Sequence, residues 1–149
     1  MQGDWRSEAH RWFQQASLDL KAVRWNIEGG FYDTASFLSQ QASEKALKSL
    51  LYHLGMRKRA LLTHSIVERI QEASPSVSSL SLLLDSARDL DLHYIPSRDP
   101  SGLPSGYPHK FYSTDVADRA YVAAERILLC VREYFEATQT WEVLGEEEM

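Results

Sequence analysis

The stretch that decides the fold is residues 32–54, which read YDTASFLSQQASEKALKSLLYHL. Two apolar stripes follow it at helical spacing, one through Ala35, Leu38, Ala42 and Ala46 and the other through Leu47, Leu51 and Leu54. A helix that is apolar on more than one side contacts several neighbours, so we expect this one at the centre of a helical bundle. Its polar side chains are expected to form one exposed edge, made of Gln40, Gln41, Glu44 and Lys48.

Four further segments show helical periodicity or helix-start signals. They are expected over residues 5–27, 64–72, about 76–92 and 113 to about 141. The third should end near His93, because Pro96 disfavours helix in the residue before it. At roughly 27 residues, the last would be about 40 Å long. Because no alternating strand pattern is present, the fold class expected is all-α, a bundle of about five helices.

Between the last two helices, residues 94–113 contain four of the five prolines and two glycines. This composition is typical of a long surface loop, and such loops in a compact domain are usually functional or disordered. Arg98, His109 and Lys110 can supply a small anion-binding patch here. Tyr94 joins them as a candidate nucleotide- or phosphate-binding residue. The aromatic side chains that either stack on a base or tie the loop to the bundle are Tyr107, Phe111 and Tyr112.

The composition indicates one domain. With 149 residues, 44% of them hydrophobic, the chain can bury about two-thirds of the surface that its unfolded form exposes. We expect the helical domain over residues 1–141 and an acidic C-terminal tail over residues 142–149. The net charge of -5 and the pI of about 5.5 give no global basic field for nucleic acid, so any phosphate binding must be local.

Several kinds of site and segment are not indicated by the sequence. The single cysteine, Cys130, cannot form an internal disulfide. The five histidines lack metal-ligand spacing, so we expect neither a metal nor a cofactor. No apolar run approaches the ~20 residues of a membrane-spanning helix, and the N-terminus has no signal-peptide pattern. We therefore expect a cytoplasmic protein without membrane contact.

Four motifs follow one another along the chain in the order of a known family. They are Trp12-Phe-Gln-Gln-Ala16 with Asp19-Leu20, the stretch Gly30–Leu51, Thr63-His64-Ser65, and Tyr94-Ile-Pro-Ser-Arg98. Together they resemble the HEPN domain family, a nucleotide-binding domain class shared by prokaryotes and higher eukaryotes, here in its stand-alone prokaryotic form. The resemblance implies an antiparallel up-and-down bundle that commonly forms a homodimer.

The resemblance implies two functions of different classes. Many HEPN proteins are partners of a minimal nucleotidyltransferase in a toxin–antitoxin-like pair, whereas others are metal-independent endoribonucleases, possible toxins that cut RNA. We expect the first, a dimer that binds a nucleotide or the partner through the surface from Arg88 to Ser113, with catalysis in the partner. In that branch the loop arginine is followed by tyrosine, where this chain has Asp99. A purely structural helical interaction module is a third alternative.

The ribonuclease alternative rests on Arg88 and His93, which satisfy the family's Arg-x4-6-His motif and are the candidate catalytic residues. A histidine can move a proton at a ribose hydroxyl, and an arginine can stabilise charge on the phosphate. Five positions apart on a helix, the two point about 140° from one another, so the resemblance implies completion of the site across a dimer axis. Asp89 and Asp91 lie between them and would repel a phosphate. The alternative role of Arg88 is an ion pair with a nearby aspartate.

Overall fold

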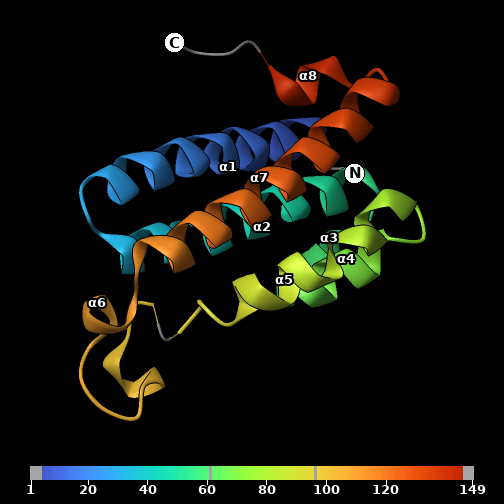
Figure 1. Ribbon diagram of the computed structural model, residues 1–149. Helices are drawn as coiled ribbons and strands as arrows, with labels where there is room; N and C mark the ends of the chain where they lie inside the picture. The colour runs from blue at the N-terminus through green and yellow to red at the C-terminus, as the bar shows by residue number, and fades with distance from the viewer. Residues whose placement is uncertain (1–4, 61, 96, 146–149) are drawn as a thin grey trace.

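The computed structural model describes residues 5–60, 62–95 and 97–145, and helices form most of this part of the chain (Figure 1). Two long helices come first, α1 (Trp5–Glu28) and α2 (Tyr32–His53). They form an antiparallel hairpin, and its turn includes Gly30 at φ +82°, a conformation that glycine adopts without strain. The shorter helices that follow are α3 (Arg57–Ala60), α4 (Ile66–Ala73), the 3-10 helix η1 (Ser78–Leu83) and α5 (Leu84–Asp91). The remaining helices are η2 (Pro100–Gly102), α6 (Pro108–Phe111), α7 (Thr114–Ala137) and α8 (Trp141–Leu144).

Helix α2 lies at the centre of the bundle, as its two apolar stripes predict. It packs against α1, α7 and α4. Its small side chains allow close approach, and Ser49 Oγ donates a hydrogen bond of 2.6 Å to the Ala9 carbonyl of α1. The colour gradient in Figure 1 shows α2 and α7 running in one direction and α1 in the other. The expected antiparallel up-and-down helical bundle is confirmed.

The helix expected over residues 76–92 is divided into η1 and α5. The first half is rich in serine, and Ser81 Oγ donates to the Ser78 carbonyl at 2.7 Å. Serine side chains that bond to the local backbone compete with regular α-helical hydrogen bonds, which favours a tighter 3-10 turn.

The loop after α5 contains two short helical turns that its composition did not predict. Both η2 and α6 begin with a proline, whose fixed φ suits the first position of a helix. The proline-rich loop before the last long helix is otherwise as expected. Pro96 lies outside the described residues.

The last long helix ends at Ala137, before the expected limit near Trp141. Gln139 adopts a positive φ of +56°, which turns the chain back towards the bundle. Helix α8 then packs on α1 and α7 with Val143 and Leu144 buried, so these residues belong to the bundle. The rest of the expected acidic tail, residues 146–149, lies outside the described residues. Within the described part of the chain, no helix is long and apolar enough to cross a membrane.

Candidate functional site

Planar side chains gather where the loop after α5 passes over α2. Tyr94 stacks on His64, with ring centroids 4.9 Å apart and planes 16° apart. The Arg98 guanidinium carbon lies 4.7 Å from the Tyr94 ring centroid and 5.5 Å from that of Phe37. Arg98 Nε donates to the Tyr94 carbonyl at 2.8 Å, which fixes the guanidinium in this position. We call Phe37, His64, Tyr94 and Arg98 the planar cluster.

A buried polar network lies beside the planar cluster and is centred on Glu44, whose side chain is 10% exposed. Glu44 Oε1 accepts from His64 Nδ1 at 2.9 Å and from Arg69 Nη2 at 3.3 Å. Glu44 Oε2 accepts from Gln41 Nε2 at 3.2 Å and from Gln40 Nε2 at 3.5 Å. The expectation of an exposed polar edge is therefore wrong for Gln40 and Glu44, because α4 packs over them and places Arg69 against the carboxylate.

The network fixes the orientation of His64. A carboxylate only accepts hydrogen bonds, so the contact with Glu44 places the imidazole proton on Nδ1. The side chain is 65% exposed, and no hydrogen bond within the described residues uses Nε2. Gln40 Nε2 also donates to the His64 carbonyl at 3.0 Å, which holds the backbone. A histidine oriented by a buried carboxylate can present its second nitrogen to a ligand or a proton.

Arg69 completes the network from inside the bundle. Its side chain is 2% exposed, and its Nη2 donates to the Thr63 carbonyl at 2.5 Å as well as to Glu44. Burial lowers the pKa of Arg69, and the charge of Glu44 opposes this effect. The pair thus joins α2 to α4 and to the segment that carries His64.

Arg88 and His93 have separate partners in the single chain. Arg88 Nη1 donates to Asp85 Oδ1 at 2.7 Å, and both of these side chains are mainly exposed. His93 is half-buried at the other end of the motif and pairs with Tyr112, its Nδ1 lying 3.0 Å from the hydroxyl. No contact among the described residues joins Arg88 to His93. Their catalytic role stays a prediction.

Asp91, one of the two acids inside the motif, lies against the N-terminus of α4, whose N-cap residue is Ser65. Its carboxylate accepts from Ser65 Oγ at 2.8 Å and from the backbone amides of Ile66 at 2.6 Å and Val67 at 3.1 Å. Free amides at a helix N-terminus favour a negative charge. Asp91 therefore has a structural role, and Asp89 is the exposed acid of the two.

His93 and Tyr112 form a neutral pair that ties the loop to α5. Burial lowers the pKa of His93, although the nearby Asp89 charge opposes this. Burial also raises the pKa of Tyr112 to about 12. Ser97 Oγ donates to the His93 carbonyl and adds a second attachment. The alternative in which loop aromatics hold the loop to the bundle thus applies to Tyr112.

His109 and Lys110 lie on α6, which packs against the start of α2. His109 Nδ1 is 3.0 Å from Asp33 Oδ1, and the His109 ring is 6.2 Å from that of Phe31. Lys110 is exposed, and no described contact links it to the planar cluster. Of the expected nucleotide- or phosphate-binding residues, Tyr94 and Arg98 are therefore together, whereas His109 and Lys110 are placed elsewhere.

Four residues that the sequence did not single out as site residues contribute here, namely Phe37, Glu44, His64 and Arg69. A signal for the first two exists in the spacing of α2. Asp33, Phe37, Gln41 and Glu44 recur every three or four residues and therefore share one helix face. Among the described residues, no cluster of His, Cys, Asp and Glu could hold a metal ion.

A model of the HEPN domain matches residues 9–134, from α1 to α7. The chain belongs to the HEPN domain family. Solved structures agree: TT1696 from Thermus thermophilus is 34% identical over 85% of this chain and 97% of that chain, with a TM-score of 0.76. ST0689, an archaeal HEPN homologue, is 36% identical over 85% and 97% of the two chains, with a TM-score of 0.68. The HEPN domain protein TM0613 from Thermotoga maritima is 30% identical over 85% and 98%, with a TM-score of 0.66.

No protein of curated function matches the sequence. The HEPN match covers α2, the planar cluster and the Arg88-to-His93 segment alike. The family resemblance of the sequence is thereby confirmed, whereas association with a nucleotidyltransferase stays a prediction.

We expect the HEPN domain with Tyr112→Phe to lose less stability at high pH than the wild type. In the wild type, the raised pKa means that the unfolded chain releases the Tyr112 proton near pH 10 while the folded chain retains it to about pH 12. Stability is therefore present below pH 10 and lost as the pH rises towards 12, by about 1 kcal/mol for a half-buried ring. Denaturant unfolding across this range measures the difference. Tyr107→Phe, on the same loop but 57% exposed, is the control; equal pH profiles in all three proteins would contradict the assignment.

Proposed function

We propose that this HEPN domain binds a nucleotide on the planar cluster, with the base against the planar groups and the phosphate on Arg98. The observation that carries the proposal is the position of the Arg98 guanidinium on the Tyr94 ring at 4.7 Å. Planar cationic and aromatic groups stack on any base, and a guanidinium matches the geometry of a phosphate. His64 Nε2 supplies a further hydrogen-bonding group at the same place.

The charges around Arg98 support phosphate binding in a chain that is acidic overall. Among the described residues, no ion pair includes Arg98. The adjacent Asp99 carboxylate accepts from the amide and the hydroxyl of Ser101 at 2.9 and 2.8 Å. Asp99, which stands where the family pattern has tyrosine, therefore stabilises a local turn. A local cationic site is what phosphate recognition needs when the net charge is -5.

In this proposal the HEPN domain forms a homodimer and works beside a minimal nucleotidyltransferase, as in a toxin–antitoxin-like pair, and the partner performs the chemistry. Family membership supports this assignment, and so does the ion pair that engages Arg88 with Asp85. We expect the gene for a nucleotidyltransferase to neighbour this one and the two proteins to co-purify. A genome without such a neighbour contradicts the partner, but not nucleotide binding.

The test of nucleotide binding is a fluorescence anisotropy titration with a labelled nucleoside triphosphate. We expect Arg98→Ala to weaken binding ten- to a hundredfold, because a charge-assisted hydrogen bond contributes about 1.5–3 kcal/mol. Arg88→Ala removes an equal charge from an exposed site outside the planar cluster and should change affinity less than about twofold. Unchanged affinity in Arg98→Ala contradicts the proposal.

The endoribonuclease alternative is tested on the same proteins. It predicts that the wild type cuts single-stranded RNA in the presence of a chelator and that Arg88→Ala and His93→Ala each abolish cutting. The nucleotide-binding proposal predicts no such cutting. Cleavage that is equal in the wild type and both variants indicates a contaminating nuclease.

A further inference from the structure

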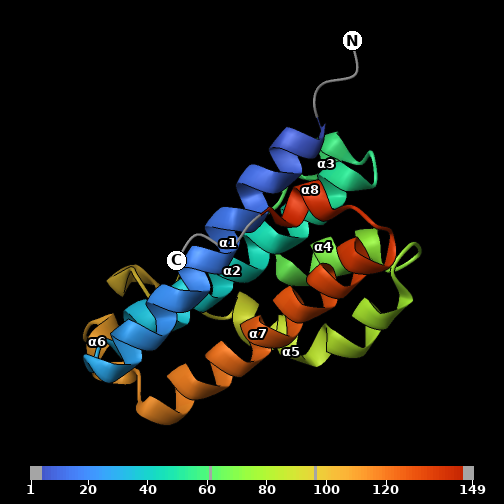
Figure 2. The same ribbon diagram turned by 90° about the horizontal axis from the view of Figure 1, so that it is seen from above.

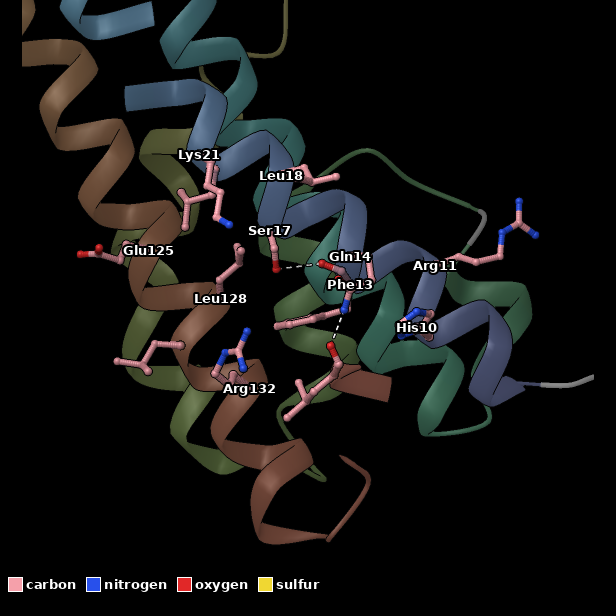
Figure 3. Close-up of a pocket in the computed structure, with 13 residues that line it drawn as sticks. His10, Arg11, Phe13, Gln14, Ser17, Leu18, Lys21, Glu125, Leu128 and Arg132 are labelled. Atoms are coloured by element: carbon pink, nitrogen blue, oxygen red, sulfur yellow. Dashed lines mark hydrogen bonds between the residues drawn. The ribbon is translucent and has the colours of Figure 1, made fainter. Parts of the chain in front are cut away.

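A groove runs between α1 and α7 (Figure 3), and α8 contributes to its lining. No residue of the planar cluster lines it. The volume of the groove is about 810 Å³. Figure 3 shows Phe13, Leu128 and Arg132 pointing into the space between the two helices. Leu18 and Leu129 also line the groove, and each is 54% exposed. An apolar groove of this kind along two long helices is a typical seat for a third helix.

The contacts of helix α8 indicate which kinds of side chain bind on this face of the bundle. The helix lies between α1 and α7 (Figure 2). Its residue Leu144 forms part of the groove lining. Val143 and Leu144 are buried against the bundle, while Glu142 pairs with Arg6 of α1 at 2.7 Å. Two aliphatic side chains and one carboxylate, which pairs with a cation of α1, thus hold this short helix on the bundle.

The rest of the groove offers the same features, and none of the helices that the structure describes occupies it. Lys21 and Arg132 extend into it (Figure 3), and neither forms an ion pair among the described residues. The carboxylate in the lining, Glu125, accepts from Tyr121 at 3.1 Å. An occupant with carboxylates beside aliphatic side chains is therefore complementary in charge as well as in polarity.

We propose that this groove binds an acidic amphipathic helix of a partner protein. The lining of α1 extends from His10 to Lys21, about 16 Å along the helix, which is the length of about three helical turns. Aliphatic side chains of the partner cover Leu18 and Leu129, and its glutamates or aspartates reach Lys21 and Arg132. The site is independent of nucleotide binding on the planar cluster.

The experiment uses a synthetic three-turn helical peptide with leucines along one face and glutamates on both sides of them. Anisotropy measures its affinity for the whole chain, and amide NMR shifts locate it. We expect shifts at Leu18 and Leu129, and binding at least tenfold weaker in Leu129→Glu and in Arg132→Glu. The matched controls are Leu82→Glu, a residue 85% exposed on η1, and Arg126→Glu, an exposed residue of α7 outside the groove; both should bind as the wild type does.

Three outcomes overturn the proposal. The first is equal affinity for a peptide with lysines in place of the glutamates, or with the leucines spread around the helix. The second is a dimer that Leu129→Glu converts to a monomer while the peptide fails to compete, which assigns the groove to a second copy of this chain. The third is the same NMR shifts with a fatty-acid carboxylate and none with the peptide. Nucleotide affinity should stay unchanged in Leu129→Glu, so failure here leaves the planar cluster proposal intact.

Discussion

Replacing Arg69 by methionine is expected to lower the free energy of unfolding by about 3–5 kcal/mol. Methionine keeps the length and the apolar stem of the side chain, so the main loss is the guanidinium. Glu44, only 10% exposed, would then be left beside His64 and two glutamines without the cation 3.3 Å from its Oε1. Removing one partner of a buried ion pair is costly because the other charge stays desolvated.

Denaturant unfolding followed by circular dichroism measures this effect, and thermal unfolding should show a midpoint lower by about 10 °C. Arg88→Met is the matched control, because Arg88 makes the same kind of ion pair with both side chains exposed, and it should leave the midpoint unchanged. Adding Glu44→Gln to Arg69→Met should recover part of the loss, since a neutral amide removes the isolated charge. An Arg69→Met protein as stable as Arg88→Met contradicts a buried charge pair.

The main helices could be predicted from the sequence because each buries an apolar stripe at helical spacing. The two stripes of α2 even gave its central position. The boundaries failed where a local effect overrides periodicity. Serine side chains divide the segment after residue 76 into η1 and α5, and the turn at Gln139 ends α7 before Trp141. These effects depend on hydrogen bonds and backbone angles that composition does not specify.

In the candidate site, only the contact between residues that are close in the sequence could be predicted. Tyr94 and Arg98 are four residues apart, and their contact follows from a single turn of chain. Glu44 resembled a surface residue because polar side chains surround it in the sequence. Its partner Arg69 lies 25 positions further on, and one sequence contains no sign of that pairing. His64 stood in the sequence only as part of the Thr63-His64-Ser65 motif, and its orientation depends on the distant carboxylate of Glu44.

Replacing Asp91 should also cause a large loss of stability. The structural role of Asp91 bears on how the Arg88-to-His93 motif is interpreted. Between those two residues an acid suggests repulsion of a phosphate, which would make its removal favourable for binding. In the structure, the Asp91 carboxylate faces the first amides of α4 and the Ser65 hydroxyl, with all three contacts between 2.6 and 3.1 Å. The negative charge of Asp91 therefore stabilises the start of α4.

We expect Asp91→Ala to destabilise the protein by about 2–4 kcal/mol, because the amides of Ile66 and Val67 and the hydroxyl of the N-cap residue Ser65 lose a charged acceptor at the start of α4. Asp91→Asn retains one acceptor oxygen and should lie between the two. Asp89→Ala, an exposed acid on the same helix, is the matched control and should leave stability nearly unchanged. Equal unfolding midpoints for the two alanine variants would contradict this role of Asp91.

The Asp91 and Asp89 variants also distinguish nucleotide binding on the planar cluster from phosphate binding at the Arg88-to-His93 motif. The two alternatives predict opposite changes in nucleotide affinity. If Asp91 positions α4, its loss disturbs the adjacent His64 and weakens binding to the planar cluster. If the motif binds phosphate directly, removing either acid strengthens binding by relieving repulsion. Titration of the labelled nucleotide against Asp91→Ala and Asp89→Ala, under conditions where both are folded, gives the sign. A gain in affinity for both would move the phosphate site from Arg98 to Arg88 and His93.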